Sequence, residues 1–203
     1  MPAASITSSF NKSIREIGVL SSYMNDCSTL ESKYQYFIGE VVMLRLFAIL
    51  ESNICDVALR LACGTPYKSG TLPIRLINCL TIGDANFKML SHGRRRPRPY
   101  LKWTYLSGIQ DSIEHVLDLN DHFFVNINNH ISLIDEMRDI RNHIAHRTSG
   151  TAVKYYNQLN SIYNANLRLP IGAFLTSKSR NPQSNIERYL LSMPIILHDI
   201  SKG

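Results

Sequence analysis

The residues best suited to chemistry lie between Glu136 and Arg147, where seven of twelve side chains are charged or histidine. On a helix, Asn142 and His146 are four residues apart and share a face, and the long side chain of Arg141 can curl toward His146. An imidazole can donate or accept a proton near neutral pH, and a guanidinium is a permanent charge that fits phosphate oxygens. These three residues therefore predict a site that acts on one anion. A solvated helix end is the alternative, but it does not explain two histidines beside so many guanidinium and amide groups.

This motif, Arg141-Asn142-x-x-Ala145-His146, resembles the HEPN superfamily. The hallmark of that family is an Arg, four to six residues, and a His at the end of a core helix, commonly with Asn directly after the Arg. The resemblance covers roughly residues 34–163, and includes a preceding long apolar helix that contains Leu50-Glu51-Ser52. Arg138 and His143 form a second match by spacing alone, and the Asn and Ala of the first match distinguish the two.

The resemblance implies a metal-independent endoribonuclease, without a cofactor, that pairs two copies of the motif at a homodimer cleft. In this scheme Arg141 binds the scissile phosphate and His146 transfers protons. Asn142 orients either His146 or the phosphate. The family further implies a toxin or anti-phage effector, with an antitoxin or other regulatory partner. Members silenced by nucleotidyl transfer carry a Tyr two residues after the His, where this chain has Thr148, so that mode of control is not expected.

The positive charge is concentrated in one central segment. Residues 60–102 contain nine Lys and Arg against the single acid Asp84, a net +8, whereas the remaining residues carry 13 basic and 15 acidic side chains, a net −2. A localised positive segment favours a phosphate-rich partner, and the alternative is a solvated loop. The prolines at 97 and 99 exclude helix there and predict an exposed basic loop.

We expect RNA to be the partner of this segment. Bases of single-stranded RNA stack on aromatic rings while arginines follow the phosphates, and Tyr100, Trp103 and Tyr105 follow the arginine run. Trp103 is expected to anchor the next helix in the core instead. The predicted substrate-binding residues are Arg94, Arg95, Arg96, Arg98, His143 and Arg147. Arg45 and Glu51, charged residues of the longest apolar helix, are further candidates for the cleft because a buried charge needs a partner.

Helical periodicity dominates the elements that must position these residues, and predicts an all-α fold: a helical bundle with a long core helix and a basic, Pro- and Gly-rich insertion. Residues 34–62 form the long helix, with one apolar stripe at Phe37, Val41, Leu44 and Ala48 and another at Leu50, Ile54, Val57 and Leu61. Further helices are expected at residues 8–22, 108–119, 131–146, 151–163 and 186–200, the last kinked or restarted at Pro194. The whole chain is interpreted as a single domain, with the basic insertion at 64–105 and a loop and C-terminal helix at 165–203.

The cysteines, the N-terminus and the apolar runs indicate the cellular compartment, and the spacing of Glu and His bears on metal binding. The four cysteines form no CxxC pair, no signal peptide is visible in the first ten residues, and the longest apolar run, interrupted by Arg45, is about half the ~20 residues of a membrane span. We therefore expect a reduced cytoplasmic protein that does not act at a membrane. No Glu-x-x-His pair supports a bundle metal site, so no metal is expected.

Two other functions are compatible with the sequence. One is a non-catalytic HEPN-like helical module that binds RNA or a partner protein, in which the motif residues would be dispensable and the arginine run essential. The other is a DNA-binding regulator, which the salt dependence of RNA and duplex-DNA binding would distinguish.

Overall fold

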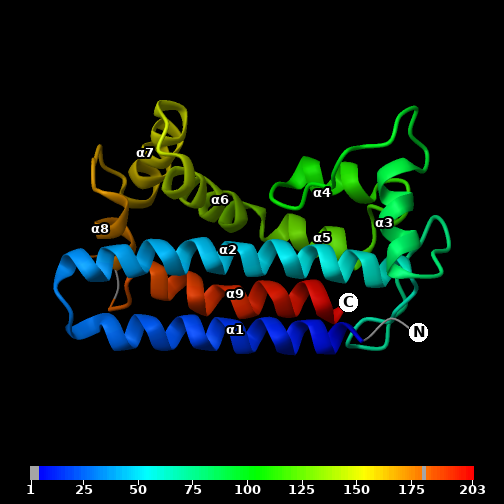
Figure 1. The fold of residues 1–203 in the computed structure, drawn as a ribbon, viewed down its shortest axis with the longest axis horizontal. Coiled ribbons are helices and arrows are strands. Elements are labelled where there is room, and N and C mark those ends of the chain that lie inside the picture. The colour runs from blue at the N-terminus through cyan, green and yellow to red at the C-terminus, as the bar shows by residue number, and fades with distance from the viewer. Residues whose placement is uncertain (1–4, 180–181) are drawn as a thin grey trace. The chain divides into compact units, whose positions relative to one another are not determined.

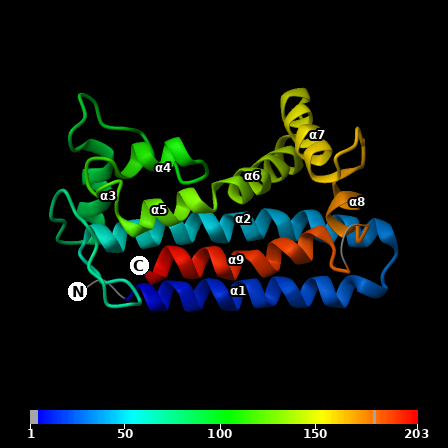
Figure 2. The same ribbon diagram turned by 180° about the vertical axis from the view of Figure 1, so that it is seen from behind.

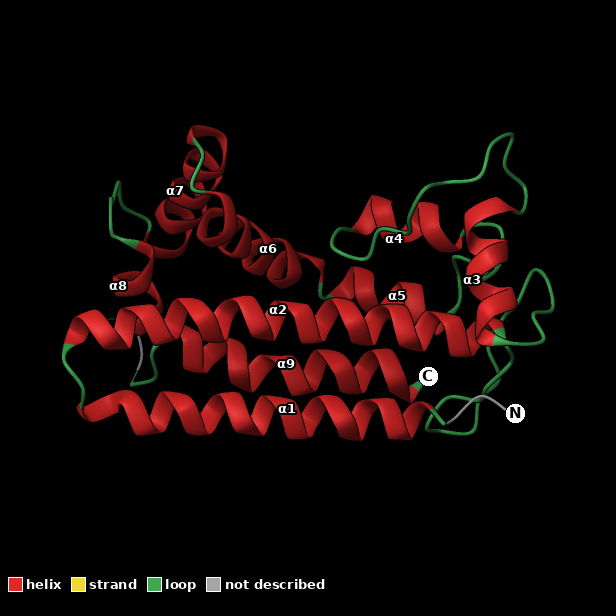
Figure 3. Cartoon of the chain, in the orientation of Figure 1, coloured by secondary structure: helices red, strands yellow, loops and turns green. Residues whose placement is uncertain are grey.

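The computed structural model describes residues 5–179 and 182–203, and within them every regular element is a helix. The only extended pairing described there is an isolated antiparallel bridge between Arg75 and Leu117. The predicted all-α class is therefore confirmed. The helices, labelled in Figure 1 and coloured red in Figure 3, are α1 (Ile6–Asp26), α2 (Ser32–Ala62), α3 (Ile82–Ser91), α4 (Leu106–Ile113), α5 (His122–Asn129), α6 (Ile131–His146), α7 (Ser149–Tyr163), α8 (Ile171–Thr176) and α9 (Asn185–Lys202), with a single 3-10 turn at Cys27–Thr29.

The chain divides into two compact units whose boundaries fall inside α1, α2, α6 and α9. The first unit comprises Met1–Ile14, Leu50–Ser132 and Ile195–Gly203, and the second comprises Arg15–Ile49 and Leu133–Pro194. The basic insertion at 64–105 lies entirely in the first unit, whereas the Arg141–His146 motif lies in the second. The single domain expected for the whole chain stays a prediction.

The first unit is built around the C-terminal half of α2. Its predicted stripe is confirmed, since Leu50, Ile54, Val57 and Leu61 are all at most 1% exposed. Helix α3 contacts α4, and α4 contacts α5. Helix α5 is tied to α9 by two polar contacts of Asp199: its backbone carbonyl accepts from Asn126 at 2.7 Å and its carboxylate pairs with His130 at 2.8 Å.

The second unit packs α6 through an apolar stripe. Ile134, Met137 and Ile140 are fully buried and Ile144 is 9% exposed. A buried polar contact reinforces this packing, because the Glu136 carboxylate accepts from both Arg188 and Tyr189 of α9. The same stripe thereby fixes which face of α6 remains available for a site.

The first half of α2 corrects the sequence interpretation. The expected stripe is largely exposed, with Phe37 at 66%, Val41 at 39% and Ala48 also exposed. The core of this half is formed by other apolar residues: Val42, Met43, Leu46, Phe47 and Ile49. Between residues 41 and 50 every position except Arg45 is apolar, so the periodicity there admits two faces and only the packing selects one.

Two short helices, α5 and α8, lie where the sequence predicts no helix. Helix α8 lies within residues 168–184, for which the sequence predicts a loop, and α5 occupies a stretch for which it predicts no helix. Helix α9 continues through Pro194. Short helices carry too few turns to show a periodicity, so tertiary packing decides them.

Close packing of α8 on α2 predicts a stability effect. A Cβ at Gly172 would lie 2.4 Å from Cβ and 2.9 Å from Cα of Tyr36, so an added methyl forces the helices apart. We expect Gly172→Ala to lower the free energy of unfolding by about 1–3 kcal/mol. The matched control is Gly18→Ala in α1, where nothing lies within 4 Å and the change should add about 0.5–1 kcal/mol. Urea unfolding of both variants tests this, and equal effects of the two changes would contradict it.

Candidate active site

The motif lies at a sharp corner between α6 and α7, seen from both sides in Figures 1 and 2. Helix α6 ends at His146, and Arg147 takes a left-handed conformation with φ of 48°. Its backbone N–H still donates to the His143 carbonyl at 3.0 Å. Thr148 then caps α7 through reciprocal side-chain and backbone bonds with Thr151. A non-glycine residue at positive φ costs on the order of 1–3 kcal/mol, so the surrounding contacts must hold it.

An ion pair ties this corner to α2 within the same unit. Arg147 Nη2 lies 2.8 Å from Glu40 Oε2, with the Arg147 side chain 69% exposed and that of Glu40 17% exposed. The Glu40 carboxylate therefore contacts the corner from a largely buried position. It holds Arg147, the residue whose left-handed conformation makes the turn. Arg147 remains accessible enough to meet a substrate as well.

The structure brings Arg141 and Asn142 together. Arg141 Nη1 donates to Asn142 Oδ1 at 3.1 Å, and both residues are half-buried. His146 lies one turn on and is exposed, and no hydrogen bond, ion pair or ring contact joins its side chain to another described residue. The corner thus presents a paired arginine and amide beside a histidine that is open to solvent.

His143 is held within the unit instead. Its ring stacks on Tyr155 with centroids 5.0 Å apart and planes 15° apart, and Nδ1 lies 3.3 Å from Thr151 Oγ1. Burial, and secondarily the charge of Arg147, lowers the pKa of His143, while Glu40 acts in the opposite direction. The imidazole is therefore neutral at neutral pH and packs the corner.

The two charged residues of α2 that are candidates for the cleft fall in different units. Arg45 is exposed in the second unit, which also holds the motif, and Glu51 is half-buried in the first unit.

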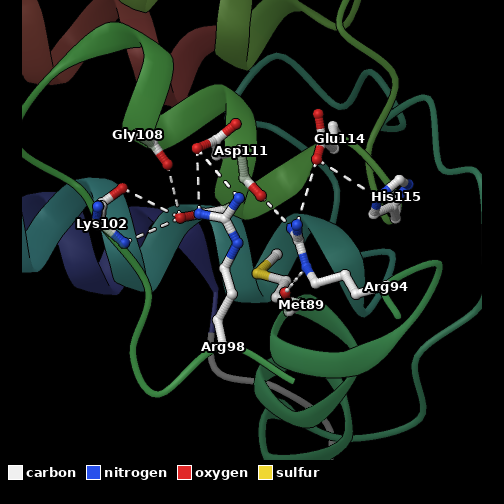
Figure 4. A network of polar contacts seen from close by, with 9 residues as sticks. Met89, Arg94, Arg98, Lys102, Gly108, Asp111, Glu114 and His115 are labelled. Atoms are coloured by element: carbon white, nitrogen blue, oxygen red, sulfur yellow. Dashed lines mark hydrogen bonds and ion pairs between the residues drawn. The ribbon is translucent and has the colours of Figure 1, made fainter. Parts of the chain in front are cut away.

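The arginine run in the first unit is anchored at both ends, as Figure 4 shows. The Arg94 side chain is only 8% exposed: it pairs with Glu114 at 3.3 Å and donates to the carbonyls of Met89 and Asp111. Arg98 pairs with the Asp111 carboxylate at 3.1 Å, and its backbone N–H donates to the Leu90 carbonyl at 2.8 Å. Both arginines therefore fasten the loop to α3 and α4.

This differs from the freely exposed loop that the sequence predicts. The side chains of Arg94 and Arg98 are bound to other residues of the protein and are only partly exposed. Arg95 and Arg96, between them, are exposed. No acidic side chain of the described residues pairs with those two. Tyr100 is 62% exposed and Trp103 is 6% exposed, which confirms the core role expected of Trp103.

Much of the positive charge of this segment is neutralised locally. Arg60 pairs with Asp56 and Lys88 with Asp84, in addition to the pairs of Arg94 and Arg98. The acids of three of these pairs lie outside the segment, so the net +8 counted along the sequence overstates the charge available to a partner. The i,i+4 spacing indicates the pairs of Arg60 and Lys88, but it gave no signal of the pairs of Arg94 and Arg98, because Asp111 and Glu114 lie on α4 and directly after it.

A metal site, a membrane-spanning helix and a disulfide bond each have structural requirements that the described residues can be compared with. No group of three or more His, Cys, Asp or Glu side chains there could hold a metal ion. None of the described helices combines the length and apolarity needed to cross a bilayer. All four cysteines are free thiols.

No family model, curated protein or solved structure matches this chain. The resemblance to the HEPN superfamily therefore depends on the motif and its place on α6.

His143 gives the protein a pH dependence of defined sign. Folding lowers the pKa of His143, so the unfolded chain binds a proton at this imidazole more tightly than the folded chain does. The stabilisation by the neutral imidazole is therefore fully present above the pKa of the unfolded chain, about 6.5, and is lost as the pH falls below it. We expect the free energy of unfolding to fall more steeply between about pH 7 and 5 in the wild type than in His143→Asn. Denaturant titrations across that range test this, and identical slopes would contradict it.

Proposed function

We propose that the protein is a metal-independent endoribonuclease whose catalytic residues are Arg141, Asn142 and His146. The observation that supports this most is the Arg141–Asn142 pair at 3.1 Å beside an exposed His146 at the end of α6. This arrangement supplies a fixed cation, an amide and a titratable group on one helix end, which are the elements that phosphodiester transfer needs.

The reaction uses the 2′-hydroxyl of the RNA itself. His146 of one copy removes the 2′-hydroxyl proton, and the 2′ oxygen attacks phosphorus as the bond to the 5′ oxygen breaks. That leaving oxygen takes a proton from His146 of the second copy, so the products are a 2′,3′-cyclic phosphate and a 5′-hydroxyl. Arg141 stabilises the charge that grows on the phosphate oxygens, and this electrostatic contribution is commonly the largest. Asn142 holds the guanidinium, or the phosphate, in position.

The number of histidines at the corner supports a homodimer. Each copy offers one exposed imidazole, because His143 is packed on Tyr155, and general acid and general base catalysis in one step uses two proton-transfer groups. The single exposed imidazole therefore supports the two-copy cleft that the family resemblance implies.

Capture of the RNA is assigned to the first unit. Arg95 and Arg96 are exposed between two anchored arginines, so they are presented on a loop that is already ordered. Preorganised cations lose less freedom on binding than mobile ones. Tyr100, also exposed, is available to stack on a base. Such an enzyme fits a cytoplasmic toxin or anti-phage effector controlled by an antitoxin or other partner.

The decisive assay incubates a panel of RNAs with purified protein in EDTA. We expect the wild type to cleave RNA and His146→Ala to lose at least about 100-fold in rate, the range of general acid–base catalysis. The matched control is His122→Ala, another exposed histidine, which lies in the first unit and should retain full activity.

The opposite results have defined meanings. Equal cleavage by wild type and His146→Ala, or no cleavage of any RNA by the wild type, would overturn the catalytic proposal. If the wild type binds RNA without cleaving it and the double variant Arg95→Ala, Arg96→Ala loses binding, the non-catalytic module is the correct function.

A further inference from the structure

The loop that follows α7 holds an arginine over an aromatic ring. The guanidinium carbon of Arg168 lies 5.2 Å from the centroid of the Tyr156 ring. Tyr156 is half-buried on α7, whereas Arg168 is exposed, so the outer side of the guanidinium is open to solvent. No acidic side chain of the described residues pairs with Arg168. The arginine therefore keeps its charge and one side of its planar group for a further partner.

The backbone around Arg168 is fixed without the Arg168 side chain. The Leu167 N–H donates to Asn160 Oδ1 at 2.9 Å. On the other side, the Tyr155 hydroxyl donates to the Leu169 carbonyl at 2.9 Å. These two bonds hold the loop on both sides of the arginine, so its packing on the ring is not needed to order the loop.

The Tyr156 ring adjoins the corner between α6 and α7 within the second unit. Its centroid lies 6.4 Å from that of the His143 ring. His143 and His146 are three residues apart on α6, and such residues have Cβ atoms about 5–6 Å apart. One side chain, that of His143, therefore separates the ring from the proposed proton-transferring residue, and Arg168 lies beyond the ring.

The chemistry of this pair fits a nucleobase. Bases of RNA stack on guanidinium planes as well as on aromatic rings, and the positive charge also attracts the phosphates on either side of the base. A base inside a duplex is covered by its neighbours on both faces, so only an unpaired base can stack in this way.

We propose that Arg168, supported by the ring of Tyr156, forms a nucleobase subsite beside the RNA-cleaving corner, and that the substrate is therefore unpaired RNA. A base one or two nucleotides from the scissile phosphate leaves the strand and stacks on the outer side of the Arg168 guanidinium. Arg168 and Tyr156 bind the substrate and take no part in proton transfer. This subsite rests on the proposed ribonuclease function, and it adds the class of RNA and the residues that select it.

The test removes the base and the guanidinium separately and together. An oligoribonucleotide that the wild type cuts at one position is prepared with an abasic ribose at each of the three nucleotides on either side of the cut. We expect kcat/KM of the full chain in EDTA to fall about tenfold for one abasic position within two nucleotides of the cut. Arg168→Gln should lose about tenfold on intact RNA and nothing further on that abasic RNA, because the two groups act as one interaction.

Matched variants separate the planar group from charge alone. Arg168→Lys keeps the charge but loses the plane, so it should behave as Arg168→Gln does. Tyr156→Phe keeps the ring and should cleave as the wild type does. Lys154→Gln removes an exposed cation of α7 and should retain the full dependence on the base. Annealing the substrate to its complement should slow the wild type at least about tenfold.

A binding measurement separates the subsite from the nuclease activity. Fluorescence polarisation compares labelled oligoadenylate with an abasic oligomer of the same length, both bound to His146→Ala so that neither is cut. Oligoadenylate should bind more tightly, and adding Arg168→Gln should reduce that difference about tenfold.

The two proposals fail in different ways. If cleavage depends on His146 but Arg168→Gln loses the same factor on intact and on every abasic RNA, the subsite is wrong and the nuclease stands. Equal cleavage of paired and unpaired RNA would also overturn the subsite. If the wild type cleaves no RNA and Arg168→Gln still reduces base-dependent binding, the nuclease is wrong and the subsite stands. If neither cleavage nor binding depends on Arg168, the arginine only packs on the ring.

Discussion

The candidate site depends on one constraint: α6 must end at His146. A helix that continued past this residue would carry Arg147 and Thr148 around the next turn and would cover the motif with a helical surface. The left-handed conformation of Arg147 stops the helix, and its ion pair with Glu40 and the Thr148 cap hold that conformation in place. His143, packed on Tyr155, fills the inside of the corner. The open His146 and the paired Arg141 and Asn142 are what this turn leaves on the outside.

The basic segment illustrates how charge is divided between fold and function. Arg94 pairs with Glu114 and Arg98 pairs with Asp111. These ion pairs hold in place a proline-containing loop that lacks the hydrogen bonds of a helix. Anchoring at both ends leaves Arg95 and Arg96 exposed on a defined backbone. A segment that looks uniformly cationic in sequence is therefore built from structural cations and presented ones, and only the latter are available to a polyanion.

Periodicity predicted the elements whose two faces differ and failed where they do not. Helix α6 has charged residues opposite Ile134, Met137 and Ile140, so both its bounds and its buried face follow from sequence. Residues 41–50 of α2 are apolar except for Arg45, so the stripe at Phe37 and Val41 could not be distinguished from the one that packs. The burial of Arg94 was equally hidden, because its partners lie on the next helix and ion pairing across elements leaves no local signal. The motif itself could be found because it is confined to two helical turns.

The chemistry of the cleavage products tests the central claim most directly. If the corner transfers phosphate by activating the 2′-hydroxyl with His146, the wild type in EDTA must yield 2′,3′-cyclic phosphate and 5′-hydroxyl ends. It must also leave uncut an RNA that carries a 2′-deoxy sugar at the cleaved position. Products with 5′-phosphate ends, or cleavage at the 2′-deoxy position, would mean that water attacks the phosphate, and the mechanism assigned to Arg141, Asn142 and His146 would be wrong.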